Sequence, residues 1–74
     1  MEVINAVSER SQVDFGRDEI LILNAALNEV CNGIAVFEFE TRIGANRERV
    51  AVLLKEIGTL LDKMDSSLSN SDIQ

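Results

Sequence analysis

The sequence contains no histidine, no proline and a single cysteine, Cys31. One cysteine excludes a disulfide within the chain, and one thiol without histidine leaves too few ligands for a zinc site. A catalytic thiol needs a neighbouring base, and no lysine or arginine stands close enough in the sequence to lower its pKa. We therefore expect Cys31 to be a small buried hydrophobic residue, and the protein to hold no metal and no cofactor.

Glycine is also scarce, because only four glycines occur and they are scattered along the chain. This spacing excludes a glycine-rich loop that would bind phosphate groups. Glu38 and Glu40 could form a catalytic acid–base pair, but residues two apart share a face only in a strand. Neither glutamate lies in apolar sequence that would raise its pKa. We expect neither enzymatic activity nor a small-molecule substrate.

Long hydrophobic runs are missing too, since no segment reaches the ~18 uncharged apolar residues of a membrane-spanning helix. The first ten residues, MEVINAVSER, carry an acid at the second position and no basic region, so a secretory signal is not expected. A lone thiol is typical of a reducing compartment. The sequence therefore predicts a cytoplasmic protein with no membrane partner.

Basic residues are outnumbered, with 7 lysines and arginines against 13 acids and a formal net charge of −6. This balance argues against a general binder of nucleic acid or of anionic membranes. Four of the bases are nevertheless clustered within residues 42–55, where Glu48 is the one acid. This segment has a local charge of +3, and the remainder of the chain has a charge of −9. The clustered bases are Arg42, Arg47, Arg49 and Lys55. The acidic remainder suits a basic protein partner.

A chain of 74 residues forms one domain at most. Domains this small usually depend on disulfides, on a metal or on association with another chain. Because the first two are excluded by composition, association is the remaining source of stability.

The segment 46–65 carries an apolar stripe at the i, i+3, i+4, i+7 spacing of one helical face. Val50, Ile57 and Met64 fit heptad position a, and Leu53 and Leu60 fit position d. The stripe predicts a long helix that packs against its copy in a homodimer, either parallel or antiparallel. The predicted dimer interface consists of Val50, Leu53, Leu54, Ile57, Leu60, Leu61 and Met64.

Two further helices are predicted upstream, over 17–32 and 35–43. The first helix has Gly16 as its expected N-cap, Glu19 as the acid at N3, and a hydrophobic staple between Phe15 and Ile20. Gly33 fits a left-handed residue that ends this helix. The segment 34–43 also alternates like a strand, but a lone strand would have no clear partner, so we favour the helix.

The predicted fold is an all-α, three-helix domain whose long C-terminal helix joins a dimeric helical bundle. Residues 15–65 form the helical domain. Residues 1–14 form an N-terminal arm, either a short strand or a first helical turn, and residues 66–74 form a flexible polar tail.

The segment FETRIGANRERVAVLLKEI, residues 39–57, carries a resemblance to the core of a bacterial helix-turn-helix that covers about residues 36–55. Gly44 would be the turn glycine between two helices. The resemblance implies that Asn46, Arg47, Arg49 and Lys55 contact DNA from the start of the second helix. At Glu40 the sequence departs from the family, which usually carries a small alanine there.

The segments NAALNEVCNG and FEFETRIGA are also similar to small uncharacterised bacterial helical proteins, which implies no activity.

A row of asparagines, Asn24, Asn28 and Asn32, follows one face of the first predicted helix at i, i+4, i+8. This row could bind the backbone of a partner, although an amphipathic helix also needs a solvated face.

The favoured function is a non-enzymatic protein–protein interaction module, regulatory or adaptor in type, that acts as a homodimer. The alternatives are a dimeric DNA-binding regulator, a toxin-neutralising protein and a scaffold.

Overall fold

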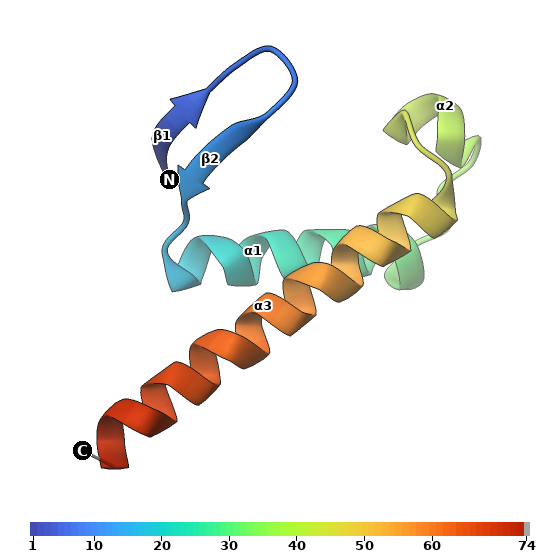
Figure 1. The fold of residues 1–74 in the computed structure, drawn as a ribbon. Helices are drawn as coiled ribbons and strands as arrows, with labels where there is room; N and C mark the ends of the chain where they lie inside the picture. The colour runs from blue at the N-terminus through green and yellow to red at the C-terminus, as the bar shows by residue number, and fades with distance from the viewer. Residues whose placement is uncertain (74) are drawn as a thin grey trace.

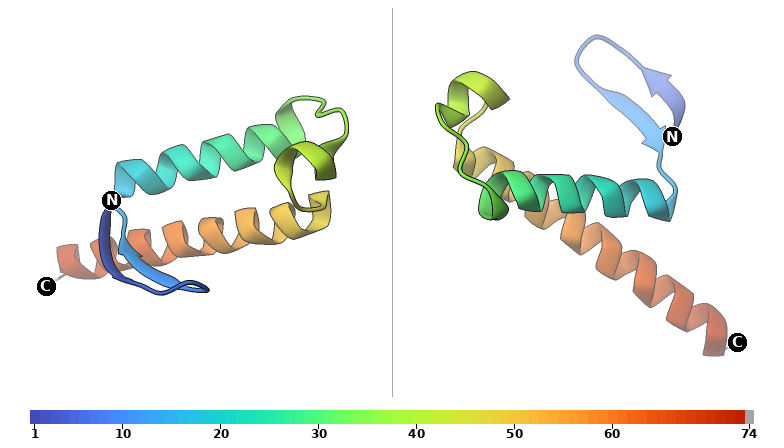
Figure 2. Two further views of the ribbon diagram at one scale, coloured as in Figure 1. Left: turned by 90° about the horizontal axis from the view of Figure 1, so that it is seen from above. Right: turned by 180° about the vertical axis from the view of Figure 1, so that it is seen from behind.

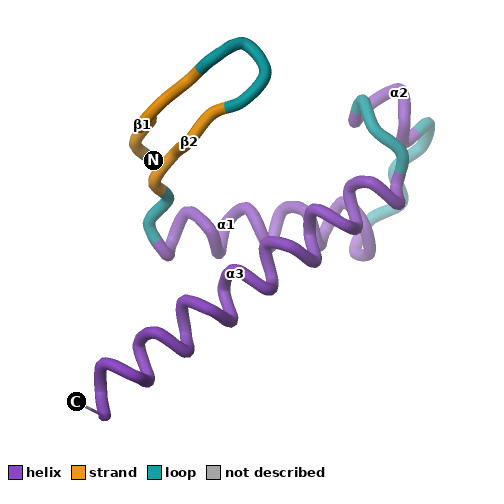
Figure 3. Tube along the Cα trace, in the orientation of Figure 1, coloured by secondary structure: helices purple, strands orange, loops and turns teal. Residues whose placement is uncertain are grey.

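A computed structural model describes the backbone of residues 1–73 and the side chains of residues 1–66. The elements in order are β1 (Glu2–Ala6), β2 (Ser11–Asp14), α1 (Arg17–Asn28), the π-helical turn η1 (Glu29–Gly33), α2 (Phe39–Ile43) and α3 (Arg47–Ile73), as Figure 3 shows. The chain is small and mostly helical, but the prediction of an all-α fold is wrong. The first fourteen residues form a two-stranded antiparallel sheet.

The hairpin pairs Val3 with Val13 and then Asn5 with Gln12, so that Ile4 is an extra residue in β1. This bulge explains why the sequence pattern did not reveal the sheet, because an extra residue breaks the alternation of side chains between the two faces. The backbone N–H of Val7 donates to the carbonyl of Arg10 and closes the loop, at 2.9 Å. An isolated hairpin is marginal in water, and this one adjoins the start of α1.

Helix α1 begins where the sequence predicts, with Gly16 as N-cap and Glu19 accepting a hydrogen bond from its backbone N–H at 2.9 Å. Its end differs from the prediction, since regular α-helix stops at Asn28 and η1 follows. The backbone N–H of Ile34 donates to the carbonyl of Glu29 at 3.0 Å, which is the i→i+5 bond of a π-turn. Gly33 is therefore not a left-handed terminal residue.

Helix α2 is shorter than the predicted helix over 35–43, because the backbone of Glu38 is left-handed, with φ 52° and ψ 53°. Residues 34–38 form an irregular connection instead. Gly44 is also left-handed, with φ 85°, and its N–H donates to the carbonyl of Glu40 at 2.8 Å. Gly44 thus ends α2 as a glycine C′ residue does, in agreement with its predicted place in the turn.

Glu38→Gly is expected to increase the free energy of unfolding by about 0.5–1 kcal/mol. A left-handed conformation costs a residue with a Cβ about 1–2 kcal/mol, and the added freedom of glycine in the unfolded chain offsets part of this gain. Urea denaturation followed by circular dichroism measures the change. Glu40→Gly, within α2, is the control and should lose about 1 kcal/mol. Equal losses in both variants would show that Glu38 is not strained.

Helix α3 is capped by Asn46, whose side-chain Oδ1 accepts from the backbone N–H of Arg49 at 2.8 Å. The helix runs to Ile73, beyond the predicted end at Asp65. The predicted flexible tail, residues 66–74, falls mainly on residues 67–74, whose side chains are outside the described part of the chain.

Helices α1 and α3 run alongside each other in opposite directions, with α2 at the turn between them (Figure 2). The hairpin and α2 rise from the same side of this helix pair, one at each end (Figure 1). Ile20, Phe39 and Val50 are the hydrophobic residues that the fold buries among those described. Within the same described part of the chain, no helix combines the length and the apolar character needed to cross a membrane.

Candidate interaction surface

Helix α1 is apolar on almost every side after its first turn. Ile20 is buried and Leu27 is half-buried, while Leu21, Ile22 and Leu23 are exposed. A helix that is apolar all round is normally covered all round, whereas α3 covers only one side of α1. The remaining apolar surface of α1 therefore lies open to solvent in the single chain.

The predicted interface stripe of α3 divides into two sets in the structure. Five of its residues are buried or half-buried along the seam with α1 and η1, namely Val50, Leu54, Ile57, Leu61 and Met64. The other two, Leu53 and Leu60, each leave 42% of their surface exposed. They lie seven residues apart, which places them on one line along the helix.

The ion pair between Arg17 and Asp65, at 2.6 Å, marks one edge of the α1–α3 seam. On α1 the buried Ile20 lies between Arg17 and Leu23 in helical phase, so Leu23 faces the opposite edge. On α3 the half-buried Leu61 separates Asp65 from Leu60 in the same way. Leu23, Leu53 and Leu60 together form what we call the leucine edge of the helix pair.

A column of alternating charges accompanies the leucine edge on α3. Arg49, Glu56 and Lys63 follow one another at intervals of seven, and each stands three or four residues from Leu53 or Leu60. Among residues 1–66, ion pairs join only the amino terminus to Glu19 and Arg17 to Asp65. The three charges of the column therefore have no ionic partner in the described part of the chain.

A second column, Glu48, Lys55 and Asp62, has the same spacing and the opposite order of signs. It lies on the side of α3 away from the leucine edge, one residue before each member of the first column. The two columns differ mainly in their apolar neighbours. This makes the second column a natural control for the first.

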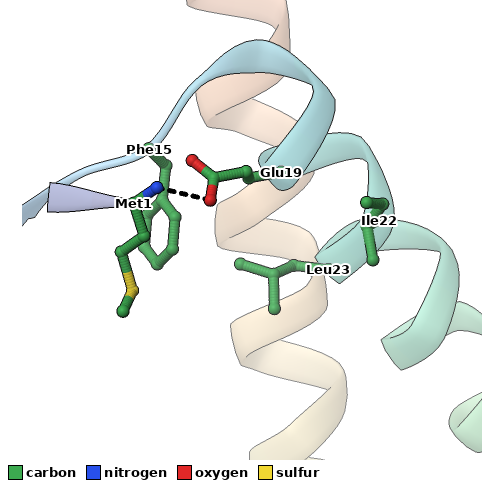
Figure 4. Close-up of a pocket in the computed structure, with 5 residues that line it drawn as sticks. All are labelled: Met1, Phe15, Glu19, Ile22 and Leu23. Carbon is green, nitrogen blue, oxygen red and sulfur yellow. Dashed lines mark hydrogen bonds and ion pairs between the residues drawn. The ribbon is translucent and has the colours of Figure 1, made fainter.

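An apolar cleft of about 290 Å³ lies between the hairpin and α1, at one end of the leucine edge. Figure 4 shows Leu23 and Ile22 from α1 on one side, and Met1 and Phe15 on the other. Glu19 lies at its rim, where the ammonium group of Met1 and then the backbone N–H of Gly16 lower the pKa of its carboxyl group. The hairpin is thus held to α1 by a charged contact beside exposed apolar surface.

Of the residues predicted to contact DNA, two make contacts within the chain and two are exposed. Arg47 donates from its guanidinium group to the carbonyl of Cys31 at 2.7 Å, and it stacks 4.5 Å from the ring centroid of Phe39. Asn46 is occupied as the cap of α3. Arg49 and Lys55 expose their side chains on α3. Arg47 therefore ties α2, α3 and η1 together, a role that no sequence pattern indicated.

The predicted asparagine row does not form one solvated face. Asn24 is half-buried at the seam with α3, close in phase to Ile20 and Leu27. Asn28 and Asn32 are exposed, and the side-chain amide of Asn32 donates to Asn28 at 3.0 Å. The part of the row that a partner could contact therefore consists of two asparagines whose side chains are hydrogen-bonded to each other.

Cys31 is half-buried and carries a free thiol. Over the residues whose side chains are described, no cluster of three or more histidine, cysteine, aspartate or glutamate residues could hold a metal ion. The candidate interaction surface is the apolar leucine edge, with the column of alternating charges beside it. Comparison with protein-family models, with curated proteins and with solved structures finds no match to this chain.

Proposed function

We propose that the protein is a non-enzymatic protein–protein interaction module that acts as a homodimer through the leucine edge of its helix pair. The observation that carries this proposal is the area that one chain leaves uncovered. Its accessible surface is 6014 Å², against about 4,500 Å² for a compact monomer of the same mass. Its radius of gyration is 15.0 Å, against about 11 Å for a compact chain of this length.

The excess of about 1,500 Å² per chain, polar and apolar surface together, is larger than the ~800 Å² that each partner contributes to a standard protein–protein interface. Single chains rarely keep large apolar patches open to water, and such patches usually mark interaction sites. A second copy of the chain is the occupant that the area and the charge pattern support. Once paired, the dimer would present the acidic outer surface to a basic partner in a regulatory or adaptor role.

Light scattering coupled to size exclusion, at concentrations from below 1 µM upward, tests this proposal. The expected result is a dimer that dissociates on dilution and has the same elution profile with and without random duplex DNA. A well-folded monomer at every concentration would overturn it. A complex with DNA that weakens steeply as salt rises would support the helix-turn-helix alternative instead.

That alternative has less support from the geometry, because Asn46 and Arg47 already make contacts within the chain. Helix α2 has only five residues, which leaves little of a first helix to lie across a DNA backbone. The net charge of −6 also opposes approach to DNA. We therefore put forward the interaction module as the function.

A further inference from the structure

We infer that two copies of the chain pair antiparallel along α3, so that Glu56 of each chain lies opposite Lys63 of the partner subunit. This inference rests on the proposed dimer and adds its orientation and register. It starts from the alternating column Arg49, Glu56 and Lys63, which borders Leu53 and Leu60. In helix pairs, charges that flank the apolar seam are the positions that select the partner's orientation.

An antiparallel pair has a two-fold axis perpendicular to the helices, and here it passes midway between Glu56 and Lys63, beside Leu60. The operation exchanges Glu56 and Lys63, so each carboxylate meets an ammonium group and the contact occurs twice. The two Leu60 side chains come near each other at the axis. The contact between the two Leu60 side chains and the charge contact therefore occur in the same register, which places Leu53 opposite Ser66 of the partner subunit.

A parallel pair in register has the opposite effect, because it brings each residue beside its own copy. Glu56 would then approach Glu56, and Lys63 would approach Lys63, in both cases with like charges. Like-charge contacts across an interface are unfavourable and exclude the arrangements that create them. The column thus favours the antiparallel dimer and disfavours the parallel one.

The charges are available for this role because none of the three has an ionic partner within residues 1–66. No residue of opposite charge lies three or four positions from Glu56 or Lys63 on the helix. A column of this kind gains nothing from contacts within its own helix. Pairing across a two-fold axis gives each of these two charges a partner.

Charge reversal tests the register through the dissociation constant, measured by sedimentation equilibrium at low salt. Glu56→Lys and Lys63→Glu should each weaken the dimer about tenfold, because each creates two like-charge contacts. The double variant, Glu56→Lys with Lys63→Glu, restores opposite charges and should return to within about threefold of the original constant. Circular dichroism confirms that each variant stays helical.

The second column supplies a matched control. Asp62→Lys gives the same net charge as Glu56→Lys, and Lys55→Glu gives the same net charge as Lys63→Glu. These two variants should leave the dissociation constant within about twofold, because their side chains lie away from the leucine edge. Equal weakening in both columns would mean that net charge alone acts, and it would overturn the inference.

The outcomes also separate this inference from the proposed function. If neither single charge reversal changes the dissociation constant of a stable dimer, the interaction module is retained and the antiparallel register is rejected. An original chain that is monomeric at every concentration would reject the dimer itself, and the register with it. Weakening by the single variants together with recovery in the double variant supports both.

Discussion

Leu53→Asp combined with Leu60→Asp is expected to raise the dissociation constant of the proposed dimer by at least about 100-fold. Each leucine leaves 42% of its surface exposed in the single chain. Complete burial of a leucine contributes about 1.5–3 kcal/mol, so covering this remainder contributes about 0.6–1.2 kcal/mol per side chain. Four leucines in a symmetric dimer then supply about 2.5–5 kcal/mol, and a 100-fold change corresponds to about 2.7 kcal/mol.

The control for this result is Leu21→Asp, an exposed leucine of α1 on the edge marked by the Arg17–Asp65 ion pair. It introduces the same chemical change outside the leucine edge, so the dimer should persist. Analytical ultracentrifugation of the variants over a dilution series provides both constants. A greater loss of dimer from Leu21→Asp than from the double substitution would assign the interface to the other edge.

Phe39→Ala is expected to lower the free energy of unfolding by about 3 kcal/mol or more. Phe39 is 9% exposed and is one of three hydrophobic residues that the described fold buries. Truncation of a buried phenylalanine leaves a cavity and typically costs about 3–5 kcal/mol. Here it also removes the ring on which the guanidinium group of Arg47 stacks. For a domain of this size the melting temperature should fall by more than about 10 °C.

Phe37→Ala is the matched control, two residues earlier in the same segment. Phe37 is 76% exposed, so its truncation should change the free energy of unfolding by less than about 0.5 kcal/mol. Thermal melts of both variants, at a concentration where the dimer is saturated, compare the two losses directly. If Phe37→Ala proves as damaging as Phe39→Ala, Phe37 must be buried in the assembled protein.

The helix starts could be predicted because their signals are local. Gly16 and Asn46 cap α1 and α3 where the sequence places them. The hairpin could not be predicted with the same assurance, because the bulge at Ile4 interrupts the alternation that identifies a strand. The shortness of α2 depends on the left-handed backbone of Glu38, a conformation for which glutamate gives no signal.

The candidate surface was only partly predictable for a related reason. The sequence groups Leu53 and Leu60 with Val50 and Ile57, because a broad apolar stripe does not reveal how many neighbours share it. The structure covers the inner residues with α1 and η1 and leaves the two leucines exposed. Arg47 appeared only as a candidate DNA contact, and its position over Phe39 depends on a tertiary arrangement that sequence spacing does not encode.

The order of the elements along the chain determines how fast one chain folds compared with how fast two chains associate. β1 pairs with β2 across a short loop, α1 pairs with α3 across the segment that holds η1 and α2, and most contacts join residues that are close in sequence. Such topologies fold in microseconds to milliseconds. Association at a typical rate constant of about 10⁶ M⁻¹s⁻¹ takes about a second at 1 µM. In the proposed dimer, each new subunit would therefore keep its apolar edge open for at least about a thousand times longer than folding takes, and the abundance of the protein would determine how long that interval lasts.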